Sequence, residues 1–248
     1  MFLHGIPTNG RLWTRVIDRL SSQFTCVAVD LPGLGRSSKV PGGLHDIDSV
    51  AAQIEELRIQ HRIERWHVVG HDAGSAIAVR YVHRFPEKVG RLALLSRALF
   101  PELRPFYLFQ LLRKPVVGEL LAPFVSFAFW HVAMRYAIDP SDGERQVPVR
   151  DFQTPFAGLF GAWRLMSILR WGEPAQVLAS MPLLLPQVGT PTMIFHGSRD
   201  PAVPEDFARR ASALLPNCEL VVLDDGHFIP LNSSERVAAG LLRFFNSQ

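Results

Sequence analysis

An aspartate occupies the centre of the motif GHDAG at residues 70–74, between an apolar stretch that ends at Gly70 and a helical pattern that begins near Gly74. Small residues two places before and after a side chain allow the sharp strand-to-helix turn that exposes it. Asp72 is ionised at neutral pH, so it can displace a leaving group from a saturated carbon without a base. We predict that Asp72 is a nucleophile; a simple helix N-cap is the alternative.

The ester that Asp72 would form must be cleaved by water, and this step needs a general base. His227, in the segment DDGHF at residues 224–228, follows the last apolar stretch and is the predicted base. Asp200 lies just past the preceding apolar stretch and is predicted to orient the His227 ring. An ordinary Asp-Pro turn is the alternative role for Asp200.

Asp224 and Asp225 are the other candidates for the orienting acid, but they adjoin the histidine in the chain and are poorly placed for the far side of its ring. The remaining histidines near the motifs, His4, His71 and His196, are interpreted as structural.

Acyl chemistry at a carboxyl carbon also needs two preorganised backbone N–H groups that stabilise the developing oxyanion. One is expected from Ala73, directly after Asp72. The other is expected from Ile6, in the early turn HGIP at residues 4–7.

Short apolar segments alternate with amphipathic helical ones, which is the pattern of an α/β fold with a mostly parallel sheet covered by helices on both faces. The expected strands are 24–30, 66–70, 89–96, 192–197 and 220–223, and the expected helices are 11–20, 46–62, 74–84, 204–214 and 233–245. Asp46 and Asp48 are expected as helix N-caps.

Residues 97–180 interrupt this alternation with many prolines and aromatics and with apolar helical patches. About 80 structureless residues are improbable inside a compact domain, so we interpret this stretch as a helical insertion. The predicted organisation is a core of residues 1–96 and 181–248 with a cap of residues 97–180.

The composition argues against several classes of function and partner. The formal net charge is +3 and no block of Lys or Arg occurs, which does not favour a nucleic-acid partner. Cys26 and Cys218 lack the spacing of a metal or redox site, so no metal or cofactor is expected and a reducing, cytoplasmic location fits. The apolar stretch 120–134 is interrupted and too short to span a membrane.

These residues together resemble the α/β-hydrolase superfamily, and specifically its aspartate-nucleophile branch, which contains epoxide hydrolases and haloalkane dehalogenases. The resemblance rests on the HGIP turn, the loop DLPGLGRS at residues 30–37, Asp72, Asp200 and His227. It implies that residues 97–180 form a helical cap over the pocket. It also implies a small hydrophobic substrate, with water as the second reactant.

The resemblance implies two chemistries. Epoxide hydrolases use cap tyrosines to protonate the opened ring, and Tyr107 and Tyr136 fall in the cap. Haloalkane dehalogenases hold a departing halide with side-chain donors, which Ile6 and Ala73 lack, although a cap tryptophan (Trp130, Trp163 or Trp171) could supply one. We expect epoxide hydrolysis to a vicinal diol, with dehalogenation or ester or lactone hydrolysis as alternatives and a non-catalytic member as a third.

In this superfamily two further strands usually precede the HGIP turn. The resemblance therefore implies that N-terminal strands, about 20–30 residues, are missing before Met1. Residues 24–30 would then form an unpaired sheet edge, which could pair with a second copy of the chain.

Overall fold

The computed structural model describes residues 1–38, 46–104, 107–134, 149–170 and 174–247. Six parallel strands form one sheet in the order β2-β1-β3-β4-β5-β6. The strands are β1 (Phe2–Leu3), β2 (Ala28–Val29), β3 (Trp66–His71), β4 (Val89–Leu95), β5 (Thr192–Gly197) and β6 (Cys218–Leu223). This arrangement confirms the predicted α/β fold with a parallel sheet.

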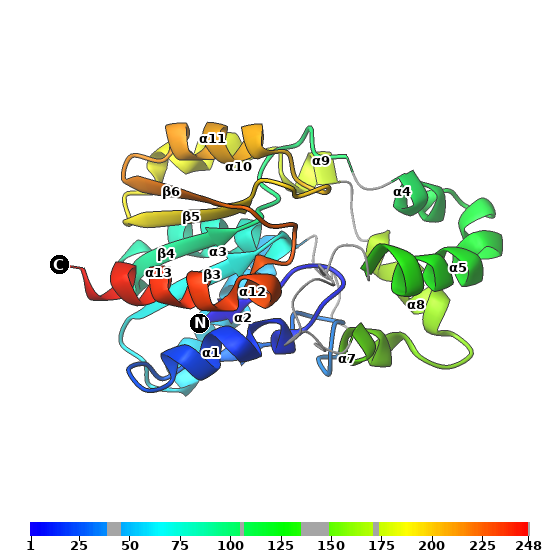
Figure 1. The fold of residues 1–248 in the computed structure, drawn as a ribbon, viewed down its shortest axis with the longest axis horizontal. Coiled ribbons are helices and arrows are strands. Elements are labelled where there is room, and N and C mark those ends of the chain that lie inside the picture. Colours follow the sequence, from blue (N-terminus) through cyan, green and yellow to red (C-terminus); the bar gives the residue numbers. More distant parts are fainter. Residues whose placement is uncertain (39–45, 105–106, 135–148, 171–173, 248) are drawn as a thin grey trace.

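Helices cover both faces of the sheet (Figure 1). On one face, α1 (Thr14–Leu20) packs against α13 (Ser234–Asn246). On the other, α2 (Ile47–Gln60) packs against α3 (Ala73–Arg84), and α11 (Glu205–Leu214) packs on β5 and β6. The carboxyl-terminal halves of β3 and β4 are buried, as expected for strands covered on both faces, and β4 ends in the continuous apolar run Leu92–Leu95.

Most expected elements are confirmed within two residues, with four differences. Only Ala28–Val29 of the expected strand 24–30 pairs, because β1 offers just two residues to pair with and Phe24 turns away to pack on Phe245. Strand β6 begins earlier, at Cys218. A 3-10 turn, Gly10–Trp13, precedes α1, and the short helix α12 (Ile229–Asn232) was not expected.

The two aspartates at the start of α2 have different roles. Asp46 caps the helix, since its carboxylate accepts a hydrogen bond of 3.0 Å from the Ser49 amide. Asp48 was wrongly expected as a cap. It lies in the first helical turn, and its two oxygens accept hydrogen bonds of 2.7 Å from the Arg80 guanidinium, a bidentate geometry that outcompetes capping.

Between β4 and β5 the described chain is helical. It contains α4 (Tyr107–Arg113), α5 (Val117–Ala128), the π-helical turn η4 (Phe129–Ala133), α7 (Val149–Gln153), η5 (Thr154–Phe156), α8 (Gly161–Leu169), α9 (Pro174–Val177), α10 (Met181–Leu184) and η6 (Leu185–Gln187). Figure 1 shows α4, α5 and α8 grouped beyond one end of the sheet. They share a small apolar cluster of their own, centred on Leu112, Ala122, Val125 and Met166.

Strand β2 is the edge of the sheet in the described residues, as predicted. Pairing of this edge with a second copy stays a prediction. Across the described ranges, no helix combines the length and the apolar character that crossing a membrane requires.

Candidate active site

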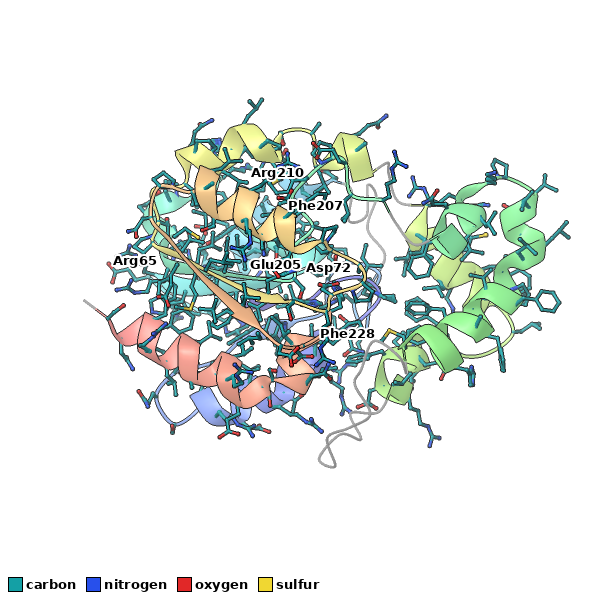
Figure 2. All side chains as sticks on the ribbon, turned by 45° about the horizontal axis from the view of Figure 1, so that its top comes forward. Arg65, Asp72, Glu205, Phe207, Arg210 and Phe228 are labelled. Atoms are coloured by element: carbon teal, nitrogen blue, oxygen red, sulfur yellow. The ribbon has the colours of Figure 1, made fainter. Side chains whose placement is uncertain are left out.

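Asp72 forms the turn between β3 and α3, and its backbone is strained. Its φ of 49° and ψ of −119° lie in a region that L residues rarely adopt, which costs about 1–3 kcal/mol. The flanking glycines make the turn possible. A Cβ at Gly70 would lie 2.5 Å from the Gly74 carbonyl oxygen, and a Cβ at Gly74 would lie 2.4 Å from the Leu3 carbonyl oxygen. The side chain of Asp72 is thus fixed at the carboxyl end of the sheet (Figure 2).

The Asp72 carboxylate faces the two backbone amides that were predicted to stabilise an oxyanion. The Ile6 amide donates a hydrogen bond of 3.1 Å to Oδ2. Burial raises the pKa of Asp72, while the His227 charge and the amides of Ala73 and Ile6 oppose the rise, and the pKa stays above its ordinary value. The structure therefore brings the Ile6 and Ala73 amides together at the Asp72 carboxylate.

The turn that carries Ile6 is held by a buried histidine. The His4 ring Nε2 accepts a hydrogen bond of 2.9 Å from the Leu31 amide, and Nδ1 lies 2.9 Å from the Gly5 carbonyl, to which it donates. Burial lowers the pKa of His4 to about 4, so the ring is neutral and keeps this tautomer. His4 thus joins the turn to the loop 30–37, a structural role that matches the expectation.

His227 and Asp200 form a hydrogen-bonded pair. The distance from Nδ1 of His227 to Oδ2 of Asp200 is 2.9 Å, and both side chains are almost fully buried. The other oxygen of Asp200 accepts hydrogen bonds from the amides of Ala202, at 2.8 Å, and Val203, at 3.0 Å. Because Nδ1 donates to Asp200, Nε2 is left as the acceptor that a general base requires.

The charges of the site determine the protonation of this pair. Burial alone would raise the pKa of Asp200, but the His227 charge, its hydrogen bond and the two amides lower it below the ordinary value. Burial alone would lower the pKa of His227, but the Asp200 charge and hydrogen bond and the Asp72 charge raise it above 6.5. Asp200 is therefore ionised at neutral pH, and His227 gains its proton more readily than an isolated histidine.

A pH dependence follows from the raised pKa. The base must be neutral, so we expect the rate of ester cleavage to fall with decreasing pH, with a midpoint above the ordinary value of 6.5. In Asp200→Asn, burial is no longer opposed by the carboxylate, and the midpoint should move to lower pH. Steady-state rates between about pH 5 and pH 9 measure both midpoints. An unchanged midpoint in the variant would contradict the assignment of Asp200.

His71 contacts the candidate base directly. Its Nε2 lies 3.0 Å from the His227 carbonyl oxygen, and its ring meets the His227 ring edge to face at 4.8 Å and stacks on Phe228. Burial, with the nearby charge of His227, lowers the pKa of His71 to about 3, so the ring is neutral. Since a carbonyl only accepts, Nε2 carries the proton. His71 is a positioning residue for the His227 backbone.

We expect His71→Phe to lower kcat by about 10- to 100-fold with little change in KM, because misplacing a base by about 1 Å has an effect of this size. The matched control is His67→Phe, on the same strand, where the ring stacks on Phe245 away from the site. Kinetics per folded molecule, with thermal unfolding alongside, test this. A lowered Tm with full kcat would show that His71 only stabilises the fold.

The two alternative acids are engaged elsewhere. Asp225 accepts hydrogen bonds from the Gly226 amide at 2.6 Å, from Asn232 at 3.0 Å and from the Ser233 hydroxyl at 2.5 Å. Asp224 is exposed and pairs with Arg199 at 2.9 Å. Asp225 therefore anchors the His227 loop to α12. This role of Asp225 was not predicted, because Asn232 and Ser233 lie seven and eight residues further along the chain and no local pattern links them to it.

The structure describes only some of the tyrosines and tryptophans of residues 97–180 that were predicted to protonate an opened ring or to hold a halide. Tyr107 begins α4, but its side chain lies outside the described residues, as do Tyr136 and Trp171. Trp163 is partly buried and its ring lies near that of Phe160. Trp130 is buried against Phe129 and Phe156, and its indole Nε1 has no hydrogen-bond partner within the described chain.

The apolar residues of the cap divide into two groups. Phe129, Trp130 and Phe156 are buried and join the main core. Phe124 and Phe127 are exposed on α5, at 74% and 64%, so they line no buried part of a pocket.

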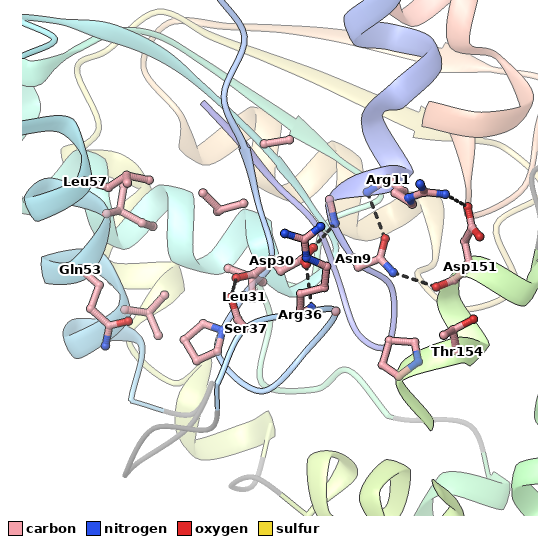
Figure 3. A pocket seen from close by; sticks show the side chains of 18 residues that line it. Asn9, Arg11, Asp30, Leu31, Arg36, Ser37, Gln53, Leu57, Asp151 and Thr154 are labelled. Carbon is pink, nitrogen blue, oxygen red and sulfur yellow. Dashed lines mark hydrogen bonds and ion pairs between the residues drawn. The ribbon is translucent and has the colours of Figure 1, made fainter. Parts of the chain in front are cut away.

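A hollow of about 900 Å³ lies beside the sheet edge rather than at Asp72 (Figure 3). It is lined by β2, by the loop that follows it, by α2 and by α7. At its rim Asn9 donates a hydrogen bond of 3.0 Å to the Asp151 carbonyl, and Arg11 pairs with the Asp151 carboxylate. These contacts tie α7 to the segment that follows the HGIP turn.

A carboxylate on a strained strand-to-helix turn, two facing amides and a later Asp–His pair define a hydrolase-type site on a parallel α/β sheet. The family model described as alpha/beta hydrolase fold matches residues 1–233, and the chain belongs to this family.

The chain is also similar in sequence to two dehalogenases. The chain is 27% identical to haloalkane dehalogenase 2 of Mycobacterium bovis, over 99% of this chain and 87% of the relative. It is 30% identical to a fluoroacetate dehalogenase of Burkholderia sp over 66% of this chain, which spans half of that relative.

Among solved structures, a putative ancestral haloalkane dehalogenase superposes with a TM-score of 0.80 at 23% identity, covering 98% of this chain and 89% of that one. A haloalkane dehalogenase from Bradyrhizobium elkani superposes equally well, with a TM-score of 0.80 at 23% identity, over 98% of this chain and 88% of that one. These likenesses establish the fold of an α/β hydrolase with dehalogenase-like relatives.

Proposed function

We propose that this protein is a hydrolase that attacks an electrophilic saturated carbon with Asp72 and then cleaves the resulting ester with water activated by His227. The observation that carries the proposal is the position of Asp72 Oδ2, which accepts the Ile6 amide at 3.1 Å. This contact holds one oxygen of the carboxylate as the future carbonyl oxygen and leaves Oδ1 to attack.

The proposed reaction has two steps, formation of an ester on Asp72 and its hydrolysis. Oδ1 forms a bond to carbon while the bond from carbon to the leaving group breaks, and the electron pair departs with the leaving group. Nε2 of His227 then removes a proton from water, and the hydroxide attacks Cγ of Asp72. The negative charge that develops on Oδ2 faces the amides of Ile6 and Ala73. Collapse releases the alkoxide, which takes the proton from His227. Asp72 is left as a carboxylic acid and returns to the carboxylate by giving its proton to the ring-opening acid after an epoxide, or to solvent after a haloalkane.

An epoxide is the substrate class that we propose first. Its leaving oxygen stays attached to the alkyl chain, so the product is a vicinal diol and no separate anion must be held. Ile6 and Ala73 offer amides to Asp72 but no side-chain donor for a departing ion. Tyr107 and Tyr136 are the proposed acids for the opened ring, and the buried apolar cap residues favour a small hydrophobic epoxide.

A haloalkane is the second candidate. The dehalogenase names of the relatives support it, and so does the buried Trp130 Nε1, which has no partner in the described part of the chain and could donate to a halide.

Trapping the ester tests the chemistry and separates the candidates. In His227→Gln the first step proceeds and the second stops, so intact-protein mass spectrometry should detect a stable adduct. An epoxide adds its whole mass, whereas a haloalkane adds only its alkyl group. Peptide mapping should place the adduct on Asp72.

The double variant Asp72→Asn, His227→Gln is the control and should stay unmodified. If a panel of epoxides and haloalkanes leaves folded His227→Gln unlabelled, the covalent mechanism is wrong, and a non-catalytic member or an ester hydrolase of a different mechanism becomes the better interpretation.

A further inference from the structure

A buried polar cluster that the proposed reaction does not use lies just past β4 and at the end of β5. Arg97 is fully buried, and none of its three guanidinium nitrogens has a hydrogen-bond partner among the described residues. The same holds for both ring nitrogens of His196, which is also fully buried, and for the Ser96 hydroxyl. Buried polar groups are nearly always paired, so such a concentration of unpaired donors requires a ligand or solvent.

The cluster lies on the face of the sheet that α11 covers. Alternate residues of a strand share a face, and the pairing of β5 with β6 places His196 on the same side as Cys218. Cys218 interacts with Ser212 of α11, and the charge of Arg97 is felt by both Cys218 and His196. Glu205, Phe207 and Arg210, which are labelled in Figure 2, belong to this helix.

The backbone at the cluster is also unusual. Ser96 has a φ of 40°, in the left-handed region that favours glycine, and it directly follows the last residue of β4. A strained non-glycine residue beside unpaired buried donors is typical of a site that holds something in place.

The charge of Arg97 is not neutralised by a contacting protein group. Burial lowers its pKa to about 9, so the guanidinium remains a cation at neutral pH. The nearest acids are in use elsewhere. Asp200 binds His227 and two amides, and Glu205 pairs with Arg209. Burial raises the pKa of the Cys218 thiol, which is therefore uncharged. A buried cation without a partner is strongly unfavourable.

We propose that Arg97 and His196, with the Ser96 hydroxyl, form a buried binding site for a small inorganic anion of the halide class. The anion accepts hydrogen bonds from the guanidinium and from one N–H of the neutral imidazole, and it neutralises Arg97, which water alone does not. Because these side chains are fully buried, the proposed ligand is a monatomic anion, the smallest one that can neutralise Arg97. The proposal concerns anion binding by residues that the proposed reaction does not use, and its test measures binding, so the inference does not depend on the proposed function.

Chloride and bromide are the probes. Thermal unfolding is followed at constant ionic strength while sodium chloride replaces sodium gluconate, whose anion is too large for the site. We expect a saturable rise in Tm of about 2–4 °C, the size produced by a ligand at a few times its Kd in a chain of this length. Crystals grown with bromide should show an anomalous peak beside the Arg97 guanidinium.

Variants assign the effect to the cluster. Arg97→Met should abolish the chloride-dependent rise whatever its own Tm is, and His196→Phe should reduce it. If Arg97→Met does not fold, His196→Phe together with the bromide peak decides the question.

Arg210→Met is the matched control, because it removes a partly exposed arginine that stacks on Phe100 and Phe207 nearby. This variant should keep the chloride-dependent rise in Tm. A Tm independent of chloride, a rise that persists in Arg97→Met, or no bromide peak at Arg97 would overturn the proposal.

Discussion

Replacement of Asp72 by asparagine is expected to reduce turnover by about 10⁴-fold or more, the loss seen when a member of a catalytic group acting as a unit is removed. The amide has nearly the same shape as the carboxylate, and its oxygen can still accept the Ile6 hydrogen bond. It carries no charge and is a poor nucleophile, so the first bond does not form. The measurement is the steady-state rate on whichever electrophile labels the His227→Gln protein.

Two controls make this result specific. Asp48→Asn removes a carboxylate in the first turn of α2 that binds Arg80 of α3, and it should leave turnover unchanged. Thermal unfolding should show that Asp72→Asn is folded, since burial already disfavours the charged form of Asp72. Mass spectrometry must exclude deamidation back to aspartate. Retention of a tenth or more of the wild-type rate without deamidation would show that Asp72 is not the nucleophile.

The second large effect concerns Gly74, where α3 passes closest to β1. We expect Gly74→Ala to destabilise the protein by about 3 kcal/mol, the upper end of the range for overpacking, which lowers Tm by about 6–12 °C. The added Cβ would lie 2.4 Å from the Leu3 carbonyl oxygen and 2.6 Å from that of His4. Both are backbone atoms of the segment that carries Ile6, so relief requires the turn to move away from Asp72.

Gly189→Ala is the matched control, because no atom lies within 4 Å of the Cβ that it adds. It should change Tm little. Calorimetry or circular dichroism of the two variants measures the difference. If Gly74→Ala and Gly189→Ala melt at the same temperature, α3 does not pack against β1 as closely as the structure has it.

The effects of Asp72 and Gly74 have a common origin. The turn at Asp72 and the HGIP turn are built from different ends of the first 74 residues, and they meet through the Ile6–Asp72 hydrogen bond and the close approaches at Gly5 and Gly74. We therefore expect the geometry of the proposed site to depend on how tightly α3 is packed on the sheet. A substitution that loosens this contact should reduce the rate even where it spares every reacting group.

Local patterns were sufficient to predict much of this molecule. Apolar runs and helical periodicity identified the parallel sheet, because strand and helix periods are properties of neighbouring residues. The glycines at 70 and 74 indicated the turn at Asp72, because that turn is a local backbone constraint. The positions of Asp200 and His227 after successive strands predicted their meeting, because the carboxyl ends of parallel strands share one edge of the sheet.

Other features depend on contacts between segments distant in the chain. Nothing local to His71 indicates that its ring reaches the His227 carbonyl, 156 residues away. The division of the cap aromatics into buried Trp130 and exposed Phe124 depends on how α5 packs, because both occur in equally apolar surroundings. Arg97 is one charge at the start of the insertion, and only the assembled fold shows that it is fully buried. The sequence alone therefore determined the fold class and the candidate reacting residues. The tertiary structure decided which polar groups contact these candidates and which buried polar groups lack a partner among the described residues, because pairing and desolvation are properties of the assembled fold.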